Sequence, residues 1–320
     1  MHEYLTPEII PAGDLYVARG LGILATDPAK SSASGGPGNL DHQYIRFSVE
    51  DLKHRVDAFR SRPQNELSDT QLRDGVYAIL LGEKSQSITF LRTKIEIAAG
   101  SNLFRARWIE DKDKQLRTTS DIWEPKAEHV SRAGRLNSSG ESILYTSLAS
   151  PRTALAECRF EVGDVFAMSR FEAKDLLSAI VVGFAPLMPG LSEENGRKLQ
   201  VIQDFLDESF SSKAGRDDPE PYRLSRLLAL EFWDMPKQMS SGWAFRSTVD
   251  PTGSGWNISF RPARGRQSLR YKETHLYELL DYDETTGTPK VKLLGAYQPG
   301  PRERLRRLTD ERVGSLTHWF

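Results

Sequence analysis

The segment between residues 133 and 158 most constrains the fold, because it carries signals for a turn, a strand and a helix in direct succession. Gly134 permits a tight turn. The apolar run that follows predicts a short buried strand over 142–146. Ser150 then offers a helix N-cap and Pro151 a first-turn residue, so we expect a helix to begin there.

Three chemically different side chains come from these neighbouring elements. Arg135 follows the glycine, and its planar guanidinium matches phosphate oxygens bidentately, although a solvated loop arginine is the plainer alternative. Tyr145 ends the strand and could stack on a flat ring, or serve as a core tyrosine. Glu157 could stabilise positive charge on a sugar, or simply be a surface glutamate beside the helix dipole. Together they suit a phosphate-linked glycoside.

The rest of the chain alternates irregularly between helical and strand-like patterns. Apolar spacing predicts helices over 48–59, 68–81, 199–210 and 222–233. Strands are expected over 103–108, 165–170, 178–184 and 256–260, with 274–282 paired to 290–297 across a turn at 285–287. Because regular strand–helix–strand units are missing from this pattern, we expect an α+β fold and not a doubly wound sheet.

Local composition suggests three regions in the chain, and the overall charge argues against nucleic-acid binding. We expect a mostly helical accessory region over 1–98 with a flexible linker over 28–40, a main domain over 99–298, and a charged C-terminal helix over 299–320. The 43 basic and 44 acidic residues give no electrostatic case for nucleic-acid binding.

Cysteine and histidine usage argues against a disulfide framework and a metal site. The single cysteine, Cys158, cannot form an internal disulfide, and the six histidines lack metal-ligand spacing. The N-terminus has no basic start and no apolar run, and no apolar stretch reaches membrane-spanning length. We therefore expect a cytoplasmic protein that uses no metal and no membrane.

Two further segments supply candidate ligands. Arg105 and Arg107 lie on one face of the strand predicted over 103–108, where either could contact phosphate; Arg105, which follows an aromatic residue, is preferred. Downstream, Ser247 ends a Gly-Trp-Ala-Phe-Arg-Ser segment that precedes a strand carrying Asn257. Alone, this serine would be interpreted as a turn or surface hydroxyl.

Taken in series, these motifs resemble the RES-domain family, whose members degrade NAD. The motifs are Phe104-Arg105, Gly134-Arg135-x-Asn137, Leu144-Tyr145, Thr153-Ala154-x-x-Glu157 and the distant Ser247. The resemblance spans about residues 103–297. Two departures lie beside the serine, where Arg246 replaces an apolar residue and Phe245 a more usual tyrosine.

The resemblance implies a fold and a reaction. The expected fold is like that of ADP-ribosyltransferases, with a central split mixed sheet and flanking helices. The expected reaction releases nicotinamide from NAD by phosphorolysis or hydrolysis, with inorganic phosphate as co-substrate in the first case. Candidate catalytic residues are Arg135, Tyr145, Glu157 and Ser247; candidate substrate-binding residues are Arg105, Asn137 and Arg107.

Other interpretations stay open at this point. The same pocket could transfer ADP-ribose to a macromolecule, or could be a non-catalytic nucleotide-binding module. The resemblance also implies toxin activity restrained by an antitoxin or immunity protein. Residues 1–98 could form the docking surface for that partner, a contact within a homo-oligomer, or a lid.

Overall fold

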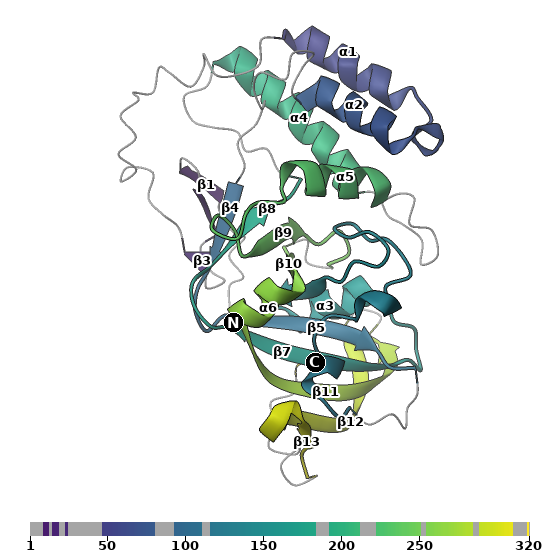
Figure 1. Cartoon of the computed structure of the whole chain (residues 1–320), viewed down its shortest axis with the longest axis vertical. Coiled ribbons are helices and arrows are strands. Elements are labelled where there is room, and N and C mark those ends of the chain that lie inside the picture. Colours follow the sequence, from purple (N-terminus) through teal and green to yellow (C-terminus); the bar gives the residue numbers. More distant parts are fainter. Residues whose placement is uncertain are drawn as a thin grey trace.

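The computed structural model combines a large open sheet with a layer of helices (Figure 1). It describes residues 9–12, 15–18, 23–24, 47–80, 93–110, 116–183, 192–211, 222–250, 254–283, 288–309 and 319. Within these residues the chain forms one mixed sheet of thirteen strands and six α-helices. The expected mixture of strands and helices without regular alternation is thus confirmed.

The strands follow a sheet order far from their chain order. The order is β1-β2-β4-β8-β9-β10-β6-β5-β7-β11-β12-β13, with β3 beside β4. The bounds are β1 Ile9–Ala12, β2 Leu15–Ala18, β3 Ile23–Leu24, β4 Thr93–Ile97, β5 Asn102–Trp108, β6 Leu144–Leu148, β7 Val165–Ala173, β8 Leu177–Val181, β9 Gly242–Arg246, β10 Trp256–Phe260, β11 Leu269–Tyr282, β12 Pro289–Pro299 and β13 Leu305–Arg307. The pairs β2–β4 and β8–β9 are parallel, and the other described pairs are antiparallel.

The helices begin where the sequence places capping residues. Their bounds are α1 Val49–Arg60, α2 Asp69–Leu80, α3 Pro151–Cys158, α4 Glu193–Ser211, α5 Tyr222–Phe232 and α6 Pro262–Ser268. Ser48 forms a capping box with Asp51, which satisfies otherwise unpaired N–H groups of the first turn of α1. Ser150 caps α3 by accepting a hydrogen bond from the Thr153 N–H at 3.1 Å.

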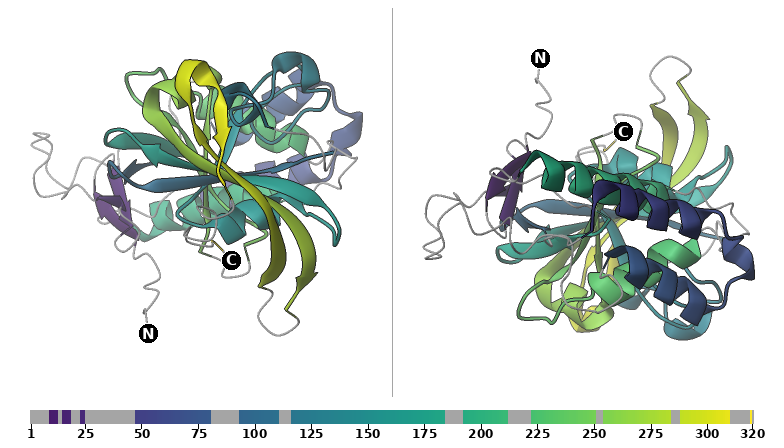
Figure 2. Two further views of the ribbon diagram at one scale, coloured as in Figure 1. Left: turned by 90° about the horizontal axis from the view of Figure 1, so that it is seen from below. Right: turned by 90° about the horizontal axis from the view of Figure 1, so that it is seen from above.

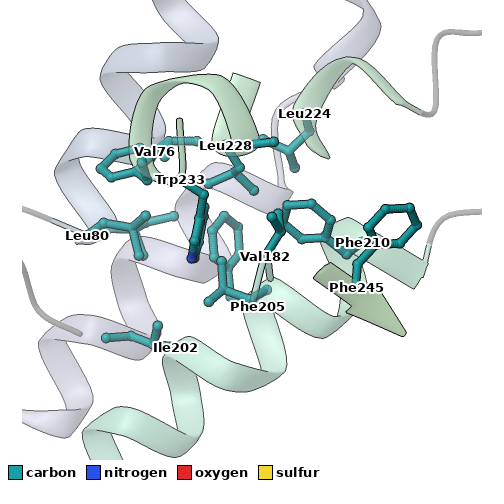
Figure 3. Close-up of a cluster of buried hydrophobic side chains, with 14 of the residues drawn as sticks. Val76, Leu80, Val182, Ile202, Phe205, Phe210, Leu224, Leu228, Trp233 and Phe245 are labelled. Atoms are coloured by element: carbon teal, nitrogen blue, oxygen red, sulfur yellow. The ribbon is translucent and has the colours of Figure 1, made fainter. Parts of the chain in front are cut away.

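Helices α1, α2, α4 and α5 form a layer at one end of the molecule, opposite β12 and β13 (Figures 1 and 2). Their apolar faces share a core cluster with β9 and with residues that flank the candidate site (Figure 3). Trp233 fills its centre, and its ring meets that of Phe210 edge-on at 6.0 Å. The helices from the first 98 residues therefore pack on helices from the main domain, while the domain boundary near residue 98 stays a prediction.

The sheet opens between β5 and β6. These strands pair at Leu103–Leu148 and Phe104–Ser147 and at no later position, whereas β5 continues beside β7 as far as Trp108. Beyond residue 104, β5 therefore forms no strand pairs with β6. Helix α3 packs against both strands beside this opening. The opening positions the candidate site.

The structure corrects several sequence-based boundaries. Residues 301–309 do not form the expected C-terminal helix: Pro301–Glu303 is a 3₁₀ turn, and Leu305–Arg307 is strand β13, paired with β12. The strand expected over 142–146 begins later, at Leu144, and ends at Leu148. Helix α6 was not expected.

Other expectations are confirmed or lie outside the description. The pairing of 274–282 with 290–297 is present as β11–β12, with Thr274 opposite Tyr297. Its turn at 285–287 and the linker over 28–40 lie outside the described residues. No helix in the described ranges has both the length and the apolar character needed to cross a membrane.

Candidate active site

A cavity of about 330 Å³ lies in the opening between β5 and β6. Its walls come from both strands, the turn before β6, helices α3 and α5, and strands β9 and β10. The lining residues are Phe104, Arg105, Ala106, Gly134, Arg135, Tyr145, Thr146, Ser147, Ala154, Glu157, Cys158, Tyr222, Phe245 and Asn257. Two guanidinium groups, one carboxylate and several aromatic rings therefore face one space.

Glu157 is held by one of its two carboxylate oxygens. Its Oε1 accepts a hydrogen bond from the Ser247 hydroxyl at 2.6 Å and another from Asn257 Nδ2 at 2.6 Å. Among the described residues, no hydrogen bond to Oε2 is formed, and the side chain is exposed at the cavity wall. The two donors fix the carboxylate plane while leaving the second oxygen accessible to a ligand.

Strand pairing explains why Asn257 presents its amide nitrogen to Glu157. Asn257 on β10 lies opposite Ser147 on β6, and the Ser147 hydroxyl donates to Asn257 Oδ1 at 2.7 Å. The side-chain oxygen is therefore engaged, so the NH₂ group is the one directed toward Glu157. Both residues are buried, with 2% of Ser147 and 4% of Asn257 exposed.

The arginines reach the site from different elements. Arg105 donates to the Ile122 carbonyl at 3.2 Å and lines the cavity. Burial, and then the neighbouring Arg107, lower the pKa of Arg105 to about 10, which leaves it charged at neutral pH. Arg107 donates to the Asp121 carbonyl and is not among the lining residues.

Arg135 lines the cavity beside helices α4 and α5. It donates to the Phe210 carbonyl at the end of α4, and its guanidinium carbon lies 5.1 Å from the centre of the Tyr222 ring. A guanidinium carries five N–H donors and a fixed positive charge, which suit it to binding an anion.

Tyr145 presents its ring to the cavity while its hydroxyl is engaged in the turn. The hydroxyl donates to Asn137 Oδ1 at 3.1 Å and accepts from the Leu136 N–H at 3.2 Å. Burial raises the pKa of Tyr145 well above its usual range. A protonated hydroxyl bonded within the turn suits a stacking surface better than an acid–base group.

Gly134 makes this turn possible by its lack of a side chain. A Cβ there would lie 2.6 Å from Asn137 Oδ1 and 3.4 Å from the Tyr145 hydroxyl. The Gly134 N–H also donates to the Asn137 carbonyl at 2.9 Å. The glycine therefore allows the Asn137–Tyr145 contact, and Arg135 follows directly.

Cys158 is unsuited to act as a nucleophile. Its thiol lines the cavity wall and donates to the Ala106 carbonyl at 3.5 Å, and desolvation there raises the pKa of the thiol to about 12. At neutral pH the thiol is protonated.

A second cavity of about 230 Å³ adjoins the first and shares Arg105, Ala106 and Tyr145 with it. Its other walls are mostly apolar and come from the segment before β6, with Asn137 and Glu141 at its polar side. The additional lining residues are Pro125, Val130, Asn137, Glu141 and Ile143. The charged Arg105 side chain thus lines two adjacent cavities.

The structure brings most of the expected site residues together. Of the residues expected from the sequence, Arg105, Arg135, Tyr145 and Glu157 line the first cavity, and Asn137 lines the second. Ser247, expected in the pocket wall, instead lies behind Glu157 and contacts its carboxylate. Arg107 lies apart from both cavities.

Sequence reasoning did not identify Asn257, which donates to Glu157, or Ser147, which orients the Asn257 amide. Asn257 stood in a noted motif but was assigned no role, and Ser147 carried no signal. Both act through the β6–β10 pairing, which joins residues 110 positions apart. Tyr222 was also missed, because a tyrosine opening an amphipathic helix is indistinguishable from a packing residue.

Comparison with known protein families identifies this region. The model of the RES domain matches residues 102–281, more than half of the chain. The matched region includes all residues of the first cavity and runs from β5 into β11. No curated protein matches the chain.

Proposed function

Because the chain belongs to the RES-domain family, we propose that it is an enzyme that cleaves the bond between nicotinamide and ribose in NAD. The observation that carries the proposal is the placement of Glu157, whose Oε1 is held by Ser247 and Asn257 while the carboxylate lines a cavity with two guanidinium groups. This anion-and-cation arrangement matches a substrate with a cationic glycosidic bond beside a diphosphate.

The chemistry needs stabilisation of a sugar cation more than it needs a strong acid. When the C1′–N bond breaks, both bonding electrons move to the nicotinamide ring, which leaves as a neutral molecule. The ribose carbon then develops oxocarbenium character. Glu157 Oε2 can stabilise that charge directly or through a ribose hydroxyl, because Oε1 is already fixed.

Acceptor attack completes the reaction. A water oxygen bonded to C1′ loses a proton and yields ADP-ribose, which is hydrolysis. A phosphate oxygen yields ADP-ribose 1-phosphate, which is phosphorolysis.

The aromatic wall of the cavity suits the nicotinamide ring, and the cationic wall suits the phosphates of NAD. Tyr145 and Phe245 meet edge-on at 6.5 Å and offer ring faces to nicotinamide. Arg105 and Arg135 can hold the diphosphate, as charge-assisted donors do. The mixed sheet, open between β5 and β6, is in keeping with an ADP-ribosyltransferase-like fold.

The second cavity gives a reason to favour a dinucleotide over a single nucleotide. It adjoins the first cavity, shares Arg105 with it and is mostly apolar. With the diphosphate at Arg105 and the nicotinamide ribose at Glu157, the adenosine half would extend into this space.

The direct test is product analysis with NAD. Purified protein is incubated with NAD, with and without inorganic phosphate, and nicotinamide, ADP-ribose and ADP-ribose 1-phosphate are separated. Nicotinamide release is expected, and a phosphate requirement would assign phosphorolysis. The Glu157→Gln variant should lose turnover but retain NAD binding, whereas Glu193→Gln, at a site 89% exposed on α4, should behave as wild type.

Two results would overturn this proposal. One is the absence of nicotinamide release under both conditions from protein purified free of any partner. The other is unchanged turnover in Glu157→Gln. Label from NAD on a macromolecule, without free ADP-ribose, would instead indicate ADP-ribosyl transfer.

An enzyme that depletes NAD would harm the cell that makes it unless its activity were restrained. We therefore extend the proposal to a toxin role with an antitoxin or immunity protein as partner. Expression of the wild-type chain alone should lower cellular NAD and slow growth, and expression of Glu157→Gln should do neither.

A further inference from the structure

The turn that carries Ser247 is tied to the first turn of α3 by Asp250. Asp250 Oδ1 accepts a hydrogen bond from the Thr153 hydroxyl at 2.6 Å. Its Oδ2 accepts from the N–H groups of Ser254 at 3.3 Å and Gly255 at 3.1 Å. Because an ionised carboxylate only accepts, the Thr153 hydroxyl donates to Asp250, and its oxygen also lies 2.8 Å from the Ser150 hydroxyl that caps α3.

The same turn sets the direction of the Ser247 hydroxyl. Ser247 Oγ accepts from the N–H of Val249 at 3.3 Å and from the N–H of Asp250 at 3.0 Å. These bonds occupy both lone pairs of the hydroxyl oxygen, so its single proton is left to donate to Glu157 Oε1. The orientation of the serine therefore depends on the backbone conformation of residues 247–250.

Helix geometry places both contacts on one face of α3. Thr153 and Glu157 are four residues apart, so their side chains lie one above the other on the helix. Packing around the Thr153–Asp250 contact is tight, because a Cβ on Gly255 would lie 2.8 Å from both Asp250 Cγ and Thr153 Cγ2. Thr153 itself is fully buried.

We infer that Thr153 and Asp250 are positioning residues that hold the Ser247 turn against α3, so that Ser247 keeps Glu157 Oε2 directed into the cavity. Neither residue lines the cavity, and both act through Ser247 and Glu157. This inference rests on the proposed function for its kinetic consequence. Its structural part, the coupling of Thr153 to Ser247, is independent of the reaction.

Kinetics of matched variants test the positioning role. Thr153→Val keeps the side-chain shape and removes the hydroxyl, whereas Thr153→Ser keeps the hydroxyl. We expect Thr153→Val to lower kcat for NAD cleavage about 10- to 100-fold, as misplacement of a catalytic group does, with KM changed by less than about threefold. Thr153→Ser should stay within about threefold of wild type in kcat.

Thr274→Val is the control for the loss of a buried threonine hydroxyl that does not contact Asp250 or Ser247. Thr274 is fully buried on β11, which β7 separates from the cavity strand β5, and its hydroxyl is hydrogen-bonded to Ser169. We expect it to lower stability and leave kcat unchanged. The inference is overturned if Thr153→Val retains wild-type kcat, or if Thr153→Ser loses as much activity as Thr153→Val.

A double-mutant cycle of unfolding stability distinguishes failure of this inference from failure of the proposed function. Urea unfolding midpoints are measured for wild type, Thr153→Val, Ser247→Ala and the double variant. If the turn couples the two residues, the shift in the double variant is clearly smaller than the sum of the single shifts. Additive shifts would overturn the coupling, even if the wild-type protein released no nicotinamide.

Discussion

Ser147 on β6 directs the amide of Asn257 on β10 toward Glu157, because its hydroxyl occupies the asparagine oxygen at 2.7 Å. The orientation of the Asn257 side chain in the candidate site is thus set by the pairing of β6 with β10. Since an asparagine amide can be turned by half a revolution with little change in shape, its hydrogen-bond partners decide which atom faces Glu157.

Asn257→Asp should therefore be far more damaging than Ser147→Ala. The aspartate would place a second carboxylate oxygen against Glu157 Oε1, where the present contact is 2.6 Å. We expect kcat/KM for NAD cleavage to fall more than about a hundredfold at neutral pH and to recover partly in acid, where one proton is shared. Ser147→Ala removes one neutral hydrogen bond and should cost about three- to tenfold. Equal losses in the two variants would contradict this assignment.

Arg105 and Arg107 provide a matched pair on one strand. Both donate to carbonyls of the 121–122 segment, but only Arg105 lines the cavity. Arg105→Gln should raise KM for NAD about 10- to 100-fold, the effect of one charged hydrogen bond to phosphate. Arg107→Gln should change KM less than about threefold. Steady-state kinetics decide between them, and a larger effect at Arg107 would move the phosphate contact to that residue.

Local signals predicted the elements of the site well, since each depends on neighbouring residues. Ser150 and Pro151 mark the start of α3, and the turn at Gly134 precedes β6 as expected. The ordered motifs also identified Arg135, Tyr145 and Glu157, which the fold brings to one cavity.

What the sequence could not supply depends on long-range pairing. The contacts of Glu157 with Ser247 and Asn257 join residues 90 and 100 positions apart. The C-terminal error has the same origin: the alternating charges after Pro301 suit an exposed helix or an edge strand equally, and pairing with β12 decides for the strand. The 3.6-residue pattern therefore carried no information on that choice.

Gly134→Ala should damage the site through the turn. The added Cβ would lie 2.6 Å from Asn137 Oδ1, so the Asn137–Tyr145 contact must shift. We expect a destabilisation of about 1–3 kcal/mol, typical of overpacking, together with reduced kcat. Gly196→Ala on α4 is the control, because nothing lies within 4 Å of its Cβ position; it should stabilise by about 0.5–1 kcal/mol. Urea unfolding and NAD cleavage are measured for both. Wild-type behaviour of Gly134→Ala would refute the steric argument.

Glu141 should contribute pH-dependent stability. Burial alone would raise the pKa of Glu141, but hydrogen bonds from the Ser138 N–H and Arg261 outweigh it and hold that pKa below its usual value. A lowered folded-state pKa gives stability that is present above the unfolded value of about 4.3 and is lost as pH falls through the folded value. The difference in urea midpoint between wild type and Glu141→Gln should therefore shrink below about pH 4. A constant difference from neutral pH to pH 3 would contradict the linkage, and Arg261→Gln should reduce the same pH dependence.

A bulky side chain in the second cavity should weaken binding of the adenosine half of the proposed substrate and leave binding of the nicotinamide half unchanged. Val130 lines that cavity but not the first. If the cavity holds adenosine, Val130→Trp should weaken competitive inhibition by AMP about tenfold and raise KM for NAD similarly, by loss of apolar contact and steric exclusion. Inhibition by nicotinamide, which needs the first cavity alone, should be unchanged. Val162→Trp is the control, since Val162 is 63% exposed and lines neither cavity. Equal weakening of AMP and nicotinamide inhibition would indicate general disruption of the site, and unchanged AMP inhibition would place the adenosine half elsewhere.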